Sequence, residues 1–240
     1  MKDIHTHILD NLDDGAKTLN ESLEILEKAY QNGFKDIILT PHYIKNSIYS
    51  ANNQEKLRKL EILQKELQKR NILINLYLGN EVYIDEDIIE LFENLEISTL
   101  NNSKYILIEL PLNNKTLILD EVLYKLKKAN LVPIIAHPER YLNYYKDYDF
   151  FASLIKKGCL FQGNIKSLYG KYGRKSKKMF KELLKRNMFH FLGSDIHHEE
   201  DDIYLKNMRK DVLKIVKNQD IVDNLFEKNI DKVLKNQEIK

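Results

Sequence analysis

The sequence has little cysteine, proline and glycine, and no long apolar run. Its 240 residues include 1 cysteine, 4 prolines and 8 glycines, which excludes an internal disulfide and leaves no low-complexity linker. No stretch approaches the roughly 18 apolar residues of a membrane span, and the N-terminus carries charges where a signal peptide needs an apolar run. A lone cysteine fits a reducing compartment. We therefore expect a cytoplasmic protein that does not insert into a membrane.

An excess of charge of one sign is also lacking. Lys and Arg number 38 against 36 Asp and Glu, so the formal net charge is +2. This balance gives no global field that would draw the protein onto nucleic acid. A nuclease or phosphodiesterase would be expected to show a basic track with interleaved aromatic residues. Any anionic ligand must therefore be bound locally.

What the sequence does contain is a repeated alternation of apolar runs and helical patterns. Most runs are continuous apolar strings, such as Ile106-Leu107-Ile108, which suits parallel strands that are covered on both faces. The first helix begins with the capping-box arrangement Thr18-Leu19-Asn20-Glu21 and stops at Gly33. Strands are predicted over residues 2–6, 36–40, 72–78, 105–110, 132–136, 159–163 and 189–192. Further helices are predicted over residues 53–70, 85–94, 117–129, 147–157 and 175–186.

This alternation predicts an α/β fold with a parallel sheet. Seven strand-helix units that close on themselves favour a barrel, with a doubly wound open sheet as the alternative. The hydrophobic fraction of 43% can form a substantial core, and no domain boundary is visible, so we expect a single domain over residues 1–240. Residues 205–240 are predicted to form C-terminal helices that pack on the barrel; a partner-binding arm is the alternative.

Ionisable residues end nearly every predicted strand. His5-Thr6-His7 ends the first, where alternation turns two imidazoles to one side, although an HxH pair alone is weak evidence for a metal site. The C-terminal ends of parallel barrel strands form the mouth where active sites lie. We therefore expect these residues to form an active site rather than merely cap loops. Besides His5 and His7, the ionisable residues at the ends of predicted strands are His42, Glu81, Glu109, His137, Asp195 and His197.

Glu109 is the most informative of these residues. It interrupts the apolar run 106–110, where its charge would be strongly desolvated unless a cation or a donor offset it. Imidazole and carboxylate ligands without a thiolate suit Mn, Fe, Zn or Co. The candidates exceed what one tetrahedral ion needs, so we expect two or three ions that share a carboxylate. A multinuclear site of this kind is typical of hydrolysis.

A set of short motifs runs in order from residue 1 to about residue 200. They are Asp3-Ile4-His5-Thr6-His7-Ile8-Leu9, Asp13-Asp14-Gly15-Ala16-Lys17-Thr18, Thr40-Pro41-His42-Tyr43, Gly79-Asn80-Glu81, His137-Pro138-Glu139-Arg140, Gln162-Gly163-Asn164, Ser167-Leu168-Tyr169-Gly170 and Gly193-Ser194-Asp195-Ile196-His197. Together they resemble the polymerase-and-histidinol-phosphatase superfamily. Within it they look most similar to the manganese-dependent bacterial protein-tyrosine phosphatases of capsule and exopolysaccharide operons.

That resemblance implies a distorted TIM-like barrel of seven strand-helix units and a site of two or three Mn²⁺ ions. It also implies a phosphotyrosine protein as substrate, such as a tyrosine kinase of polysaccharide export. Carried over by position, the implied ligands are His5, His7, Glu81 and Asp195 for one ion, Glu81, Glu109 and His137 for a second, and Asp14, His42 and His197 for a third. Asp13 is the alternative to Asp14.

The catalytic residues expected at this site are Arg140, Asp14 and His42. The planar guanidinium of Arg140 can bind two phosphate oxygens, although a surface arginine is the alternative. The family pattern implies a second arginine shortly after His197. Here the run His-His-Glu-Glu-Asp-Asp at 197–202 stands instead. Such an acidic run would repel a polyanion unless one of three cationic side chains folds back over the site: His198, Lys206 or Arg209.

Other functions remain open at the level of the sequence. A thiol-based phosphatase needs an arginine six positions after its cysteine, and Ile165 stands there after Cys159, which is instead predicted to be a small buried residue. A small-molecule phosphatase of the histidinol-phosphate type shares the superfamily and its metal cluster. A catalytically weak scaffold of the same fold is a further alternative.

Overall fold

Parallel strands form the centre of the molecule. The computed structural model describes residues 1–239, except for the side chains of residues 202–204. All paired strands run parallel, in the order β1-β2-β4 in one sheet and β3-β5-β6-β7-β8-β9 in the other. The strands are β1 (Lys2–Asp3), β2 (Asp36–Leu39), β3 (His42–Tyr43), β4 (Asn75–Leu78), β5 (Glu81–Tyr83), β6 (Tyr105–Glu109), β7 (Val132–Ala136), β8 (Leu160–Asn164) and β9 (Phe191–Gly193). The predicted α/β fold with parallel strands is confirmed.

The prediction of seven strands in one closed barrel is not confirmed. The described residues form nine strands in sheets of three and six, because the second and third predicted runs are each continued by a further short strand. Thr40 and Pro41 separate β2 from β3, and a proline has no N–H to donate to a ladder. Gly79 and Asn80 separate β4 from β5. These breaks place His42 and Glu81 at the first positions of β3 and β5.

Backbone hydrogen bonds join the first and last strand segments. Thr6 forms a parallel bridge with Ile196. The N–H of His7 donates to the carbonyl of Ile196, and the N–H of Asp195 donates to the carbonyl of His5, both at 2.9 Å. The strand order follows the chain without the reversal that defines a doubly wound sheet, which argues against that alternative.

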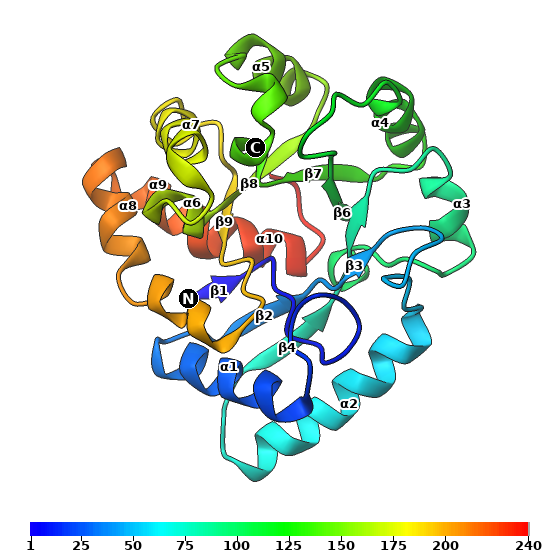
Figure 1. Ribbon diagram of the computed structural model, residues 1–240, viewed down its shortest axis with the longest axis vertical. Helices are drawn as coiled ribbons and strands as arrows, with labels where there is room; N and C mark the ends of the chain where they lie inside the picture. The colour runs from blue at the N-terminus through cyan, green and yellow to red at the C-terminus, as the bar shows by residue number, and fades with distance from the viewer. Residues whose placement is uncertain (240) are drawn as a thin grey trace.

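Helices surround the strands (Figure 1). The side chain of Thr18 accepts a hydrogen bond from the N–H of Glu21 and so caps α1, as the sequence predicts. One short helix, α6, was not predicted. The α-helices before residue 190 are α1 (Leu19–Gln31), α2 (Asn53–Lys69), α3 (Ile88–Glu93), α4 (Leu119–Lys128), α5 (Tyr148–Lys156), α6 (Ile165–Tyr169) and α7 (Gly173–Lys185). The 3₁₀ turns are η1 (Leu100–Asn102), η2 (Pro138–Arg140), η3 (Leu142–Tyr144) and η4 (Glu199–Tyr204).

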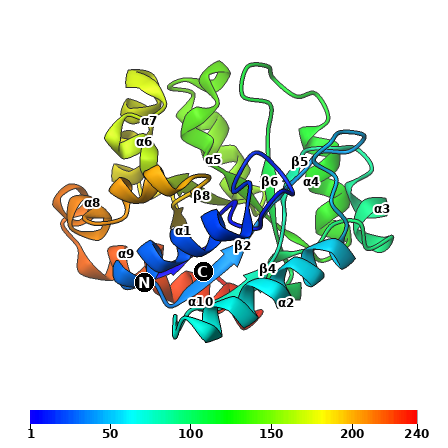
Figure 2. The same ribbon diagram turned by 60° about the horizontal axis from the view of Figure 1, so that its bottom comes forward.

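The C-terminal segment covers one end of the strands (Figure 2). It comprises α8 (Met208–Val216), α9 (Gln219–Asp223), the π-helical turn η5 (Asn224–Lys228) and α10 (Asn229–Leu234). Ile230 and Val233 of α10 are fully buried in an inner cluster with strand residues such as Leu107 and Ile134. The residues next to Leu107 and Ile134 along β6 and β7 point to the opposite face of the strands, into a larger apolar cluster beneath the helices. Among the described residues, no helix has both the length and the apolar character needed to cross a bilayer.

Candidate metal centre

The strand ends and the loop before α1 bring all nine candidate ligands to one region of the fold. His5 and His7 follow β1, His42 begins β3, and Glu81 begins β5. Glu109 ends β6, His137 follows β7, and Asp195 and His197 follow β9. Asp14 lies in the loop between β1 and α1. Three overlapping groups of these side chains have ligand atoms within 4.8 Å of one another.

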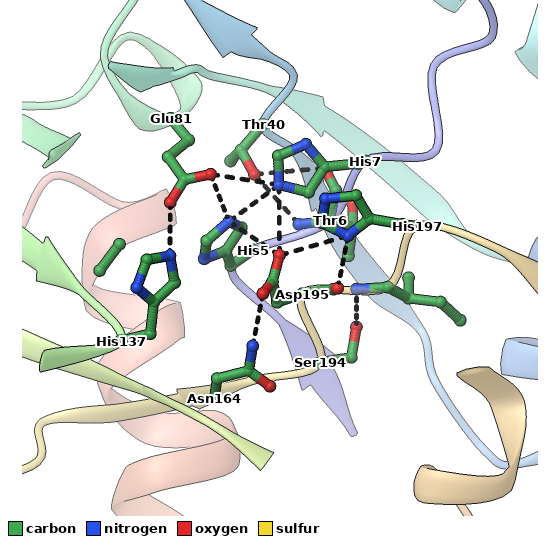
Figure 3. Close-up of polar contacts among 12 residues, drawn as sticks. His5, Thr6, His7, Thr40, Glu81, His137, Asn164, Ser194, Asp195 and His197 are labelled. Carbon is green, nitrogen blue, oxygen red and sulfur yellow. Dashed lines mark hydrogen bonds and ion pairs between the residues drawn. The ribbon is translucent and has the colours of Figure 1, made fainter. Parts of the chain in front are cut away.

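The first group consists of His5, His7, Glu81 and Asp195, all of them buried (Figure 3). The Nε2 atoms of the two histidines are 3.0 Å apart. Glu81 Oε2 lies 3.1 Å from that atom of His5 and 3.3 Å from that of His7. Asp195 Oδ1 lies 3.5 and 3.3 Å from them, respectively. Two imidazole nitrogens and two carboxylate oxygens therefore face a common point.

The tautomers of His5 and His7 show why this group fits a cation. His5 Nδ1 lies 2.8 Å from Gln162 Oε1, and His7 Nδ1 lies 2.6 Å from Asp13 Oδ2, and both partners are acceptors. In its neutral form, each imidazole therefore carries its proton on Nδ1 and turns the lone pair of Nε2 inward. The inward atoms are then four acceptors without a donor among them, which is the arrangement that a metal ion satisfies. Outer partners that orient ligating imidazoles in this way are a general feature of metal sites.

The second group shows which of the two adjacent acids, Asp13 or Asp14, faces the other candidate ligands. Asp14 lies with its Oδ1 3.6 Å from His42 Nε2 and 3.5 Å from His197 Nε2, and His7 completes the group. Asp13 instead accepts hydrogen bonds from the N–H groups of Gly15 and His42 in addition to its contact with His7. Gly15 allows this close packing, since a Cβ there would lie 2.0 Å from the carbonyl oxygen of His7. Asp14 is thus the acid that faces the other candidate ligands.

The third group contains His42, Glu81 and Glu109. His42 Nδ1 is 3.1 Å from Glu81 Oε2 and is a buried atom without a hydrogen bond. His137 Nε2 also faces this group, at 2.9 Å from Glu81 Oε1 and 3.6 Å from Glu109 Oε1. Glu81 therefore contacts members of all three groups and stands where a bridging carboxylate would be placed.

Electrostatics at the site also favour a bound cation. Burial and the neighbouring charge of Glu81 raise the pKa of Glu109 to about 9. Burial and the charge of Arg140 lower the pKa of His137 to about 4, which keeps its imidazole neutral. Burial opposes the ionisation of Glu81 and Asp195, but His5 and several other neighbouring groups together outweigh it and hold both pKa values well below their usual range. A metal ion beside Glu109 would offset the repulsion that keeps its carboxyl group protonated.

Arg140 lies beside these groups rather than on the outer surface. Its side chain is 20% exposed, with Nη1 at 3.4 Å from Asp195 Oδ2. Its guanidinium lies 4.1 Å from the centre of the Tyr172 ring, and the Tyr172 hydroxyl is 3.3 Å from Asp195 Oδ2. This cation–π contact supports the guanidinium from one side. Arg140 therefore lines the cavity and is not an ordinary surface arginine.

Several side chains that support the site were not predicted individually. Gln162 holds His5, and the amide of Asn164 donates to Asp195 Oδ2 (Figure 3). Lys166 donates to the backbone carbonyl of Asp195. Polar residues in the buried strand β8 and the buried helix α6 are the signal that could have identified them.

The site opens into a cavity of about 500 Å³. His198 lines it, but its Nδ1 lies 3.2 Å from Glu21 Oε1. Arg209 pairs with Asp223 and Glu227, and neither it nor Lys206 lines this cavity. Of the three cationic side chains that could fold back over the site, only His198 therefore lines the cavity. The side chain of Asp202 lies outside the described residues.

Comparison with known proteins decides the family. A family model described as capsular polysaccharide synthesis, CpsB/CapC, matches residues 1–235. The chain belongs to the CpsB/CapC family. CapC of Staphylococcus aureus is 38% identical over 198 residues, covering 82% of this chain and 77% of its own. The tyrosine-protein phosphatase YwqE of Bacillus subtilis is 32% identical, with 82% and 78% covered. The family resemblance inferred from the motifs is confirmed.

Solved structures agree with this membership of the CpsB/CapC family. A chain from the crystal structures of YwqE from Bacillus subtilis and CpsB from Streptococcus pneumoniae, described as unique metal-dependent tyrosine phosphatases, matches with a TM-score of 0.92 at 30% identity. That match covers 100% of this chain and 96% of the other. Histidinol phosphate phosphatase from Lactococcus lactis matches with a TM-score of 0.56 at 16% identity, over 89% and 91% of the chains. At that identity the similarity concerns the fold alone.

Proposed function

We propose that this chain is a metal-dependent protein-tyrosine phosphatase that hydrolyses the phosphomonoester of phosphotyrosine. The observation that carries the proposal is the convergence of four buried acceptors, from His5, His7, Glu81 and Asp195, beside the guanidinium of Arg140. Such a site offers a cation position and an anion clamp together. Membership of the CpsB/CapC family, whose relatives include tyrosine-protein phosphatases, supports the same activity.

The proposed cofactor is Mn²⁺, with two or three ions, and Fe, Zn or Co are the alternatives that the same imidazole and carboxylate donors also suit. Bound ions would supply Lewis acidity for the phosphoryl group and lower the pKa of the attacking water. The proposed ligands are His5, His7, Asp14, His42, Glu81, Glu109, His137, Asp195 and His197. Glu81 is proposed as the residue shared between ions.

Three side chains have proposed roles toward the substrate. Arg140 would donate its planar fork to two phosphate oxygens, held in place by the ring of Tyr172. Asp14 and His42 both line the cavity and would help to hold an ion, which would offset the charge that develops on the departing oxygen. The departing phenolate has an unperturbed pKa of about 10, so it requires less protonation than an alkoxide would. No covalent enzyme intermediate is required.

The proposed substrate is a phosphotyrosine protein, such as a tyrosine kinase of polysaccharide export in the cytoplasm. The family description, capsular polysaccharide synthesis, supports this partner. Cell fractionation that recovers the protein only outside the cytoplasm would contradict the location.

The test of the proposed function is turnover of a phosphotyrosine peptide by metal-free and reconstituted protein. Chelation should abolish turnover, and Mn²⁺ should restore it, because the four inward acceptors of the first group require a cation. Phosphoserine peptide and histidinol phosphate serve as competing substrates, measured by released phosphate. A protein that keeps full activity after complete metal removal, or that prefers histidinol phosphate, would contradict the proposal.

We further propose that the chain is one folding domain with a distorted barrel of seven strand-helix units. The backbone hydrogen bonds between residues near His5 and Asp195, and the burial of α10 residues against the strands, support it. An Ile230→Ala variant should lower the free energy of unfolding by about 2 to 5 kcal/mol in a single urea transition. Ile48→Ala, at a side chain that is 87% exposed, is the control. Two separate transitions would contradict a single domain.

A further inference from the structure

The cavity beside the candidate metal centre has few cationic side chains for a site that receives a dianion. Six carboxylates from the described residues line it, but only three permanently cationic side chains. The carboxylates belong to Asp14, Glu81, Glu109, Asp195, Glu200 and Asp201. The cationic side chains are Arg140, Lys166 and Lys171. Which of the two lysines can reach a bound anion therefore affects how the substrate is held.

Lys166 is committed to the protein itself. Its side chain is only 4% exposed, and its Nζ lies 2.9 Å from Asp201 Oδ2. The same Nζ donates to the backbone carbonyl of Asp195. Releasing it would leave a buried carboxylate and a buried carbonyl without this donor, which is costly. Lys166 therefore supports the loop after β9 and is not available to a ligand.

Lys171 is placed differently. Its side chain is 46% exposed, and its Nζ lies 3.7 Å from Asp201 Oδ1, beyond hydrogen-bond distance. Asp201 already has the closer ammonium of Lys166, and its Oδ2 also accepts from the N–H of His197. Moving the Lys171 ammonium toward an anion in the cavity would therefore break no hydrogen bond and leave Asp201 paired.

The backbone holds Lys171 at the cavity. Gly170 ends α6 with a φ of 91°, a left-handed conformation that favours glycine. The N–H of Lys171 then donates to the carbonyl of Lys166 at 3.2 Å. The next residue, Tyr172, lies against Arg140. The turn after α6 thus places the partly exposed ammonium of Lys171 next to Tyr172, which contacts the guanidinium.

We infer that Lys171 is a second phosphate-binding cation, which contacts an oxygen of the substrate phosphoryl group that Arg140 does not occupy. The inference rests on the proposed phosphatase function and deepens it. Lys171 would also offset the negative charge of the acidic run after His197, because its ammonium lies beside Asp201 of that run in the free protein. A lysine contributes here as a point charge and not as a planar fork.

The test compares Lys171→Met and Lys171→Arg with Lys178→Met, an exposed α7 lysine that does not line the cavity. Inorganic phosphate is the probe, titrated calorimetrically into manganese-loaded protein, and kinetics with a phosphotyrosine peptide run in parallel. Lys171→Met should weaken phosphate binding about tenfold and raise KM by a similar factor, because a charge-assisted contact is lost. Lys171→Arg should restore most of the affinity, and Lys178→Met should match the parent protein.

A purely structural role for Lys171 predicts another pattern. Lys171→Met would then lower the melting temperature while phosphate affinity and KM stay unchanged, and that result overturns the inference. Inactivity of the parent protein toward phosphotyrosine contradicts the proposed function instead. The phosphate titration still decides the role of Lys171 in that case, so the two failures are distinguishable.

Discussion

A Glu81→Gln variant is expected to lose at least about 10³-fold in kcat/KM, which is roughly 4 kcal/mol of transition-state stabilisation. Glu81 contacts His5, His7 and His42 through Oε2 and His137 through Oε1. Glutamine has nearly the same shape, but one of its two terminal atoms is an NH₂ donor that cannot ligate a cation. Both proposed metal positions that share the Glu81 carboxylate should therefore bind metal more weakly. The bound metal content should fall together with the activity.

The measurement combines elemental analysis of dialysed protein with steady-state kinetics. Glu90→Gln, at an exposed position on α3, is the matched control and should retain both metal and activity. The melting temperature of the metal-free variant checks that it folds. Full metal content together with full activity in Glu81→Gln would remove Glu81 from the site.

An Arg140→Ala variant is expected to separate substrate binding from metal binding. Its guanidinium lies beside Asp195 but belongs to none of the ligand groups, so the metal content should remain that of the parent. Loss of the phosphate clamp should lower kcat/KM by about 10² to 10³, as for the removal of one preorganised donor from a catalytic site. Arg140→Lys should recover only part of this loss, since an ammonium cannot reproduce two parallel hydrogen bonds.

Phosphate inhibition measures the clamp directly, because the inhibition constant for inorganic phosphate should rise with the loss of Arg140. Arg58→Ala, at an exposed position on α2, changes the same charge away from the cavity and should leave the constant unchanged. An Arg140→Ala variant that loses metal but keeps its phosphate inhibition constant in the remaining loaded fraction would show that Arg140 supports the metals instead.

The convergence of the candidate ligands could be predicted from sequence because parallel strands impose a simple rule. Buried strands require apolar residues, so a charged residue such as Glu109 within an apolar run has to be compensated. Parallel strands end at one edge, so Glu109, His137 and Asp195 had to lie together. The same apolar strings predicted the positions of β6, β7 and β8 to within about a residue at each end.

Other features depend on tertiary contacts that no local pattern encodes. The breaks after β2 and β4 fall at residues 40–41 and 79–80, and hydrophobic periodicity alone does not place them. The choice between Asp13 and Asp14 depends on the fold of one loop. The roles of Lys171 and Tyr172 depend on the turn after α6, a helix of 5 residues that was too short to be recognised by periodicity.

The most direct test of the account is a crystal structure of the protein grown with Mn²⁺ and phosphate, with the ions located by anomalous scattering. Manganese peaks are expected among His5, His7, Glu81 and Asp195, and in at least one of the two adjoining groups. Phosphate is expected between these ions and Arg140. Manganese absent from these groups, or phosphate bound away from Arg140, would contradict it.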